Sequence, residues 1–264
     1  FNPFVPMLRR WLLLFLSLSP LAAMAAPFNV FADGETFTYK VSWAVFPGAG
    51  RIVIAAHDDV LQGRSVVRLT VDTTTRGVIR LFYDYEDKAE AVVDRITGQL
   101  LHASDKGGGG GKETSDSDTT FDYAARKVTH VNRARPGRDR VFDLPPGDPI
   151  DLISCLIDTR NWDVKPGDKR DAVVYFDNDV YPVTITAMDY ETVDTALGTF
   201  KALRLEPAMT HNAKGIFARQ GQIQVWVSQS APRLPVKMQL HLKLGTATLT
   251  LIKHEPGKAT PPGL

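Results

Sequence analysis

The chain has 264 residues, of which 44% are hydrophobic, and its formal net charge of +1 is almost balanced. That balance argues against a protein built for bulk nucleic-acid binding, which needs a clear excess of basic residues. The single cysteine excludes an intramolecular disulfide, so stability has to come from a buried core, which a chain of this length can supply.

Residues 1–25 have the pattern of a secretory signal peptide, with a true start at Met7. Arg9 and Arg10 supply the basic region, and an apolar run follows at residues 11–21. That run is too short to span a bilayer comfortably. The small residues at 23–25 form the expected cleavage site, and no cysteine lies there, so a lipoprotein is not indicated. The residues after the arginine pair favour the general secretory route over the twin-arginine route.

The mature protein is therefore expected to begin near Ala26 and to be periplasmic. Removal of Arg9 and Arg10 changes the formal charge from +1 to −1, because 29 basic residues then face 30 acidic ones. No later segment is apolar enough to span a membrane. The remaining length, about 240 residues, fits one large domain, which we place at residues 26–255.

Period-two alternation dominates this domain. In residues 236–244 the apolar positions Val236, Met238, Leu240, Leu242 and Leu244 alternate with polar ones. Such strands bury one face and expose the other, as antiparallel strands do. Turn signals at short intervals divide the chain into roughly ten to twelve strands. The fold class predicted is mainly β: an antiparallel, strongly curved sheet or barrel-like single domain with one short α-helix packed against it.

Two stretches are expected to be flexible. The five glycines of residues 107–111 are followed by a polar run, and together they predict a long flexible hairpin loop without any phosphate-binding role. Residues 256–264 are rich in proline and glycine and predict a flexible tail.

Basic residues gather in the segment 126–140. A solvated strand and loop is one interpretation, and contact with anionic headgroups or another anionic surface is the other. Interleaved aromatic residues are absent, so a nucleic-acid stacking platform is not indicated. The residues of this basic patch are Arg126, Lys127, Arg133, Arg135, Arg138 and Arg140.

The segment Asp148–Arg160 is predicted to be a helix in a chain that is otherwise β. Asp148 suits the N-cap and Pro149 the first helical position. The apolar residues cover a broad arc, so the helix is expected to be buried against the sheet or to close one end of a barrel. Burial of its apolar side chains makes it a plug, whereas a mobile lid over a ligand is the alternative.

Polar residues on this helix allow both a structural and a functional interpretation. Asp151, Ser154 and Asp158 form a narrow strip, which is either a carboxylate pair for acid–base work or, as we favour, a solvated face. Cys155 lacks a neighbouring base and is expected to be a small buried hydrophobe. Arg160 is expected to be structural: it snorkels, stacks on Trp162 or pairs with a buried acid.

Three residues near the C-terminus also allow more than one interpretation. Trp226 lies on the nominally polar face of its strand and needs cover, either from the helix, as we favour, or from a ligand. Ser228 ends that strand without a nearby histidine or acid and is expected to be structural. His254 is expected to lie at an exposed strand end. A ligand or structural cluster is thus placed at Asp151, Ser154, Arg160 and Trp226.

Chemistry with a recognisable signature is not predicted. The six histidines form no pair at metal-ligand spacing, and one cysteine cannot build a structural zinc site. Neither a nucleophile elbow nor a credible S-x-x-K motif occurs. We therefore assign no catalytic residue, no metal ligand and no cofactor.

An ordered set of short motifs resembles the exported bacterial family of domain of unknown function 3108. The resemblance runs from Phe31 to Ile252 and implies an exported, mostly β single domain with the helix as part of its plan, but no function. Family members often carry an aromatic residue where this chain has Ile157. The motifs are Gly34-Glu35-x-x-x-Tyr39, Asp151-x-x-Ser154, Arg160, Pro166-Gly167, Gly198-Thr199-Phe200, Val225-Trp226-Val227-Ser228 and Arg233-Leu234-Pro235-Val236.

Three functions follow, in order of preference. The first is a non-catalytic binding or carrier module that holds an apolar or amphipathic ligand, such as a lipid, inside a curved sheet. The second is a structural or accessory envelope protein that acts through its surface, on an envelope protein or an anionic surface. The third is a hydrolase with an unrecognised site, which has least support because no nucleophile and base emerge.

Overall fold

A computed structural model describes residues 28–209, 211, 213–242 and 245–258. The predicted signal peptide at residues 1–25 lies outside the described residues, as do residues 259–264. Fifteen strands of the described chain form one sheet, which confirms the mainly β prediction and exceeds the number of strands expected. No described helix is long and apolar enough to cross a bilayer.

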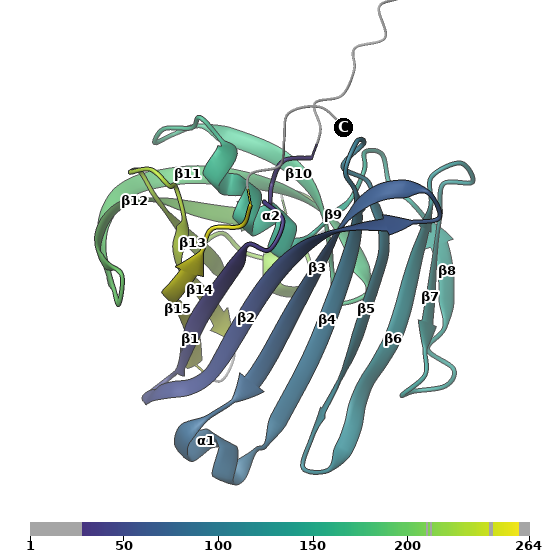
Figure 1. The fold of residues 1–264 in the computed structure, drawn as a ribbon, viewed down its shortest axis with the longest axis horizontal. Coiled ribbons are helices and arrows are strands. Elements are labelled where there is room, and N and C mark those ends of the chain that lie inside the picture. Colours follow the sequence, from purple (N-terminus) through teal and green to yellow (C-terminus); the bar gives the residue numbers. More distant parts are fainter. Residues whose placement is uncertain (1–27, 210, 212, 243–244, 259–264) are drawn as a thin grey trace, which may run out of the picture.

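The strands follow one another around the sheet in chain order, and the last one, β15, pairs with β1 (Figure 1). The sheet edges are β8 and β9, so the sheet is not closed. Neighbouring strands are antiparallel except β9 and β10. The N-terminal half holds β1 (Thr36–Trp43), β2 (Phe46–Leu61), β3 (Arg64–Thr75), β4 (Tyr85–Asp94), β5 (Leu100–Gly109), β6 (Lys112–Asp122), β7 (Lys127–Asn132) and β8 (Arg140–Asp143).

The C-terminal half faces this layer. Two short helices interrupt the strands: α1 (Gly77–Phe82) lies between β3 and β4, and α2 (Leu152–Asp158) follows β9, with a 3-10 turn at Thr159–Asn161. The strands of this half are β9 (Ile150–Asp151), β10 (Lys169–Phe176), β11 (Asp179–Thr195), β12 (Gly198–Ala208), β13 (Ile223–Ser228), β14 (Pro235–Leu242) and β15 (Gly245–Glu255).

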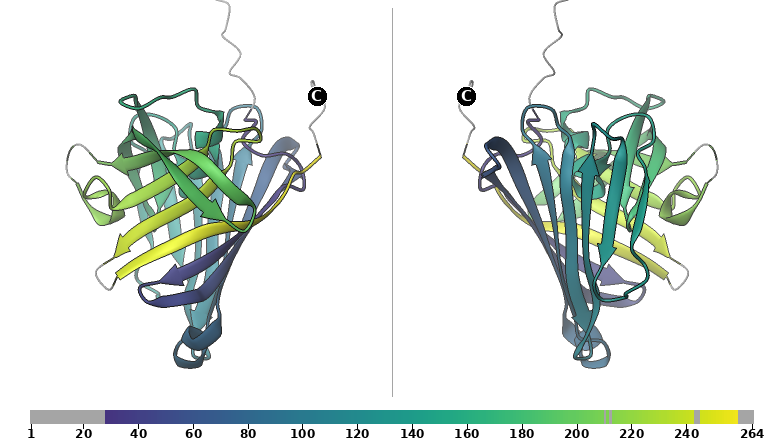
Figure 2. Two further views of the ribbon diagram at one scale, coloured as in Figure 1. Left: turned by 90° about the vertical axis from the view of Figure 1, so that its left-hand side faces the viewer. Right: turned by 90° about the vertical axis from the view of Figure 1, so that its right-hand side faces the viewer.

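Strong curvature brings the two halves into contact. Register shifts in β1, between Thr38 and Tyr39, and in β11, between Ala187 and Tyr190, mark bulges that bend and twist their strands. Across the interior the ring of Tyr175 on β10 packs edge-on against Phe121 on β6, with ring centroids 5.1 Å apart. The core therefore lies between the halves, with α2 at one end and α1 at the other (Figures 1 and 2).

The glycine run is strand and not a flexible loop, which corrects the prediction made from composition. Gly107 pairs with Asp87 on β4 and Ser115 on β6. A Cβ at Gly107 would lie 2.2 Å from the Asp87 carboxylate, so only glycine allows this close approach. Gly110 and Gly111 form the two-residue turn, at φ +61° and +75°, values that suit a hairpin turn.

The helix begins later than predicted, at Leu152, and its N-cap is Asp151 instead of Asp148. Ile150 and Asp151 are extended because they pair with Val174 and Tyr175 on β10. Hydrogen bonding to a strand edge thus overrides the Asp-Pro helix start. The side chain of Asp151 accepts a hydrogen bond from the Ser154 N–H at 2.9 Å.

The start of the predicted tail pairs with the segment before β1. The Lys258 N–H donates to the carbonyl of Asp33 at 2.7 Å, and the two residues form a β-bridge. A Cβ at Gly257 would lie 2.4 Å from the same carbonyl, so glycine is needed there. Residues 256–258 thus contact the domain, and residues 259–264 of the predicted tail lie outside the described residues.

Candidate functional site

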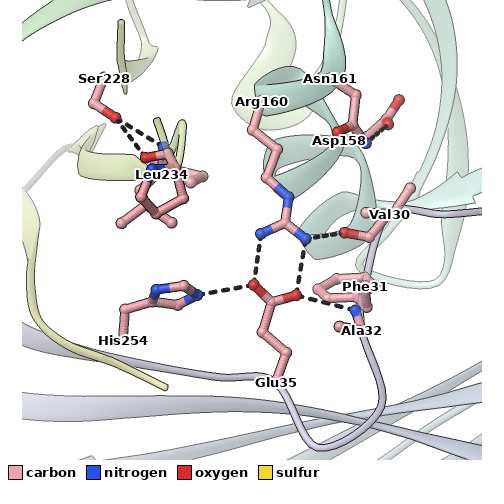
Figure 3. Close-up of polar contacts among 12 residues, drawn as sticks. Val30, Phe31, Ala32, Glu35, Asp158, Arg160, Asn161, Ser228, Leu234 and His254 are labelled. Carbon is pink, nitrogen blue, oxygen red and sulfur yellow. Dashed lines mark hydrogen bonds and ion pairs between the residues drawn. The ribbon is translucent and has the colours of Figure 1, made fainter. Parts of the chain in front are cut away.

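A buried ionic cluster lies at the α2 end of the molecule (Figure 3). Glu35 precedes β1, Arg160 follows α2 and His254 comes from β15, so three distant segments meet there. Arg160 donates from Nη1 to Glu35 Oε1 at 2.6 Å and from Nη2 to Oε2 at 2.8 Å. His254 Nε2 donates to the same Oε1 at 2.8 Å. We call these three residues the Glu35 cluster.

The chain itself saturates the Glu35 cluster. The Ala32 N–H donates to Glu35 Oε2 at 3.2 Å, and Arg160 also donates to the carbonyl of Val30. Phe37 closes the cluster from one side, with its ring centroid 4.8 Å from that of His254. Glu35 is only 3% exposed, so the cluster offers neither an accessible acceptor nor room for a substrate.

The electrostatics of the Glu35 cluster favour a permanent carboxylate. Burial by itself raises the pKa of Glu35, but hydrogen bonds from Arg160 and His254, together with the Arg160 charge, outweigh it. The pKa of Glu35 is lowered from its ordinary 4.5 to about 2. A carboxyl held this acidic is a poor proton donor at neutral pH. The cluster ties the N-terminal segment, α2 and β15 together.

The sequence indicated a structural role for Arg160 but did not identify Glu35 and His254 as the other members of the cluster. A buried acid was among the expected partners of Arg160, and Glu35 is that acid, whereas Trp162 stacks on Arg170, whose guanidinium lies 4.5 Å from the ring centroid. His254 was expected at an exposed strand end, yet its side chain is only 9% exposed. The only local signal was Glu35 inside the Gly34-Glu35-x-x-x-Tyr39 motif.

The polar strip of the helix is not a solvated face, contrary to our prediction. Asp151 and Ser154 are buried, and Asp158 is partly exposed and accepts a hydrogen bond from Trp162 Nε1 at 2.8 Å. Burial raises the pKa of Asp151. Asp151 Oδ2 and Ser154 Oγ find no hydrogen-bond partner among the described atoms. These two side chains belong to the interior.

Cys155 is buried in the core, as expected. Burial, and then the charges of Asp158 and Asp151, raise the pKa of its thiol to about 12. A thiol at that pKa is protonated at neutral pH and therefore a weak nucleophile. Ser228, expected to be structural, holds a turn: its Oγ accepts a hydrogen bond from the Leu234 N–H at 2.9 Å.

Trp226 finds its cover on the sheet and not from the helix, which corrects the prediction. Its indole Nε1 donates to Glu191 at 2.8 Å, and the ammonium of Lys237 lies 4.2 Å from its ring centroid. Arg204 is its partner across β12 and β13. Trp226 therefore does not form one cluster with Asp151 and Ser154, because the residues that it contacts lie on strands β11 to β14.

The basic patch is largely occupied by internal contacts. Lys127 pairs with Asp143, and Arg133 with Asp116 and Asp118. Arg126 donates to backbone carbonyls, including that of Gly147 at 3.1 Å. Arg140 lies over the ring of Phe142, at 4.9 Å from its centroid. Arg135 and Arg138 are exposed on the loop between β7 and β8.

The wall of the interior becomes polar towards the α1 end. Ala103 on β5 and Thr119 on β6 form a buried pair on the inner face. The next pair on that face towards α1 is Asp105 and Ser117, and the Ser117 hydroxyl donates to the Asp105 carboxylate. Asp87 on β4 lies on the same inner face, and burial raises its pKa. An apolar ligand would find no matching wall there.

A hollow of about 530 Å³ lies beside β10 and β11. Asp171 and Pro182 on its lining are exposed, so it opens on the outer surface. Within residues that the structure describes, no group of three or more His, Cys, Asp and Glu side chains is placed to hold a metal ion.

Comparison with known proteins places this geometry in a family. The family model described as "Protein of unknown function (DUF3108)" matches residues 38–252. A solved structure, the β-barrel-like protein of domain of unknown function DUF1849 from Brucella abortus, aligns with a TM-score of 0.57 at 9% identity. The alignment covers 86% of this chain and 99% of that one, so the likeness is one of fold.

A second solved structure aligns less well. It is a "putative exported protein with YmcC-like fold" from Bacteroides fragilis, with a TM-score of 0.35 and 12% identity over 88% of this chain and 100% of that one. No curated protein matches the sequence.

Proposed function

Because this chain belongs to the DUF3108 family of proteins of unknown function, we propose a role from its own geometry. We propose that it is an exported, non-catalytic protein of the cell envelope that acts through its surface. The signal-peptide pattern at residues 1–25 supports export to the periplasm. A single cysteine cannot form an intramolecular disulfide, so packing of the core has to stabilise the fold.

The observation that carries this proposal is the contact between the two halves of the sheet. Tyr175 OH and Thr119 Oγ share a hydrogen bond of 2.7 Å across the interior, and Phe121 packs against the same tyrosine ring. Thr119 is 1% exposed and Tyr175 is 8% exposed. Direct side-chain contact between the halves at this point supports a packed interior.

The polar groups support a non-catalytic role. A reactive site needs a nucleophile or a base that a substrate can reach. Glu35 is saturated by donors of the chain, and Cys155 is buried as a protonated thiol. The features best suited to function therefore lie on the outside.

A carrier for an apolar or amphipathic ligand, our first expectation from the sequence, has less support. Such a protein needs an apolar cavity that encloses most of the ligand. Here the inner wall near α1 carries the polar side chains Asp87, Asp105 and Ser117.

Native mass spectrometry of the protein, purified from the cells that produce it, tests this proposal. The expected spectrum holds the bare polypeptide. A positive control is the variant Phe121→Ala, which opens space between the halves and should raise the binding of a hydrophobic fluorescent probe such as N-phenylnaphthylamine. A stoichiometric co-purified amphiphile in the unmodified protein, displaced by that probe, would overturn the proposal in favour of the carrier.

A further inference from the structure

Helix α1 has its polarity reversed relative to an ordinary surface helix. At about 100° per residue, Val78, Leu81 and Phe82 share one face and Arg80 lies on the opposite one. Leu81 and Phe82 are each 83% exposed, and no residue of the helix is buried. A surface helix normally turns its apolar face to the core, so this one is unpartnered.

A second apolar segment adjoins the helix. Val45, also 83% exposed, and Phe46 lie at the turn between β1 and β2. The Arg76 N–H donates to the carbonyl of Ala49 at 2.8 Å, which holds the start of α1 beside β2, three residues after Phe46. Val45, Leu81 and Phe82 are the most exposed large hydrophobic side chains of the described chain. We call Val45, Phe46, Val78, Leu81 and Phe82 the apolar tip.

The arginine of α1 is paired with two carboxylates of the chain. Arg80 lies 3.1 Å from Asp84 and 3.0 Å from Glu86, so it is held back towards the strand and away from the apolar face. Tyr83 stacks on Tyr85, with ring centroids 5.7 Å apart, at the base of the helix. The apolar face of the tip is therefore free of charged side chains, and Arg80 with its two carboxylates lies behind it.

We propose that the apolar tip inserts into the surface of a lipid bilayer and anchors the protein there reversibly. The inference rests on the proposed function, since it names the surface through which the protein acts and the partner of that surface. Exposed apolar side chains on a short interfacial element enter the boundary between headgroups and acyl chains. Phe82 suits the apolar side of that boundary, and Tyr83, with an apolar ring and a polar hydroxyl, suits the boundary itself.

The small size and the position of the apolar tip favour a lipid bilayer as its partner over a second copy of the chain or another protein. Helix α1 lies at the narrow end of the molecule, where the hairpin turn between β5 and β6 reaches about the same level (Figures 1 and 2). A stable protein interface needs about 800 Å² and roughly 20–30 residues from each partner, arranged as a complementary surface. A turn and a six-residue helix supply less than that surface, whereas binding to a bilayer needs no complementary shape and scales with the apolar area buried.

Flotation of the protein, purified from the cells that produce it, with lipid vesicles tests the inference. The vesicles are pure phosphatidylcholine, or phosphatidylcholine partly replaced by anionic phosphatidylglycerol. The tip variant is Leu81→Asp with Phe82→Asp, and the matched control is Val141→Asp with Leu197→Asp, which changes exposed apolar residues of β8 and of the turn between β11 and β12. All four sites are exposed, so both variants should fold, which circular dichroism verifies.

The protein and the control variant should float with both kinds of vesicle, and the tip variant should float at least about tenfold less, because aspartate is unfavourable among lipid chains. Phe82→Trp should be quenched by brominated lipids, whereas Val141→Trp should not. Equal flotation of the tip variant, loss of flotation in the control, or no flotation at all would overturn the inference. So would a dimer in sedimentation that the tip variant makes monomeric.

These outcomes separate the inference from the proposed function. A protein that does not float but carries no internal ligand leaves the proposed function standing without this partner. A protein that floats through its tip and also holds a stoichiometric internal amphiphile keeps the inference and removes the proposed function.

Discussion

Glu35 and Arg160 are joined by two hydrogen bonds, of 2.6 and 2.8 Å, although 125 residues separate them in the chain. The pair connects the segment before β1 to the turn after α2, and His254 adds β15. Since β1 and β15 are the neighbours that join the two halves of the sheet, the pair fastens α2 over that junction.

Replacement of Glu35 by glutamine should destabilise the protein strongly. The amide keeps the shape but leaves the buried Arg160 without a counter-charge, a loss of about 3–5 kcal/mol for a buried pair broken on one side. Urea denaturation measures the free energy of unfolding. The control Glu255→Gln changes a nearby exposed carboxylate, which contacts Lys253 and Thr36, and should leave stability almost unchanged. Equal effects of the two variants would contradict a specific role for the pair.

Acid should remove the same stabilisation. The pKa of Glu35 is lower in the folded protein, at about 2, than its ordinary 4.5, so the unfolded chain binds the proton more tightly. The contribution is fully present above pH 4.5 and is lost as the pH falls towards 2, amounting to about 3 kcal/mol. The melting temperatures of the protein and of Glu35→Gln should therefore converge over this window. A constant gap down to pH 2 would assign the stabilisation to another group.

Truncation of the α2 residue Ile157 distinguishes a plug from a lid. Ile157 is fully buried, whereas Ile153 on the same helix is only partly buried. Ile157→Ala should cost about 2–5 kcal/mol and lower the melting temperature by many degrees. Ile153→Ala removes the same atoms and should cost clearly less, which makes it the matched control. Thermal denaturation that shows a near-normal melt for Ile157→Ala would indicate a mobile lid.

Local patterns predicted the strands, because alternation is a property of neighbouring residues. Val236 and Met238 are buried where the period-two pattern places them, and Lys237 between them is not. The register of β15 against β1, which joins Tyr39 to Leu251, has no local signal. The Glu35 cluster depends on that register, and it therefore could not be read from the sequence.

Three predictions failed because a tertiary contact overrode a local preference. Asp148 and Pro149 have the character of a helix start, but β10 draws Ile150 and Asp151 into a strand. Trp226 found cover from Glu191 and Lys237, which reach it through strand pairing and not through the helix. In each case the deciding partner lies far away in the chain.

The glycine run shows the third failure and allows a direct test. Five glycines have the composition of a flexible linker, yet Gly107 is held between β4 and β6 with the Asp87 carboxylate where a Cβ would lie. Backbone atoms of Glu86 and Asp87 would also lie 2.7 Å from that Cβ, so rotation of one side chain cannot relieve the clash.

Gly107→Ala should therefore destabilise the protein by about 1–3 kcal/mol or more, as overpacking does. The matched variant is Gly111→Ala in the adjoining turn, where a Cβ meets nothing within 4 Å and only the φ of +75° is unfavourable. That variant should cost about 1 kcal/mol. Urea denaturation compares the two variants, and limited trypsin digestion at Lys112 provides a second measurement. A flexible loop would be cut rapidly and would tolerate Gly107→Ala without loss of stability, whereas a paired hairpin should resist cleavage in the unmodified protein and become susceptible in the Gly107→Ala variant.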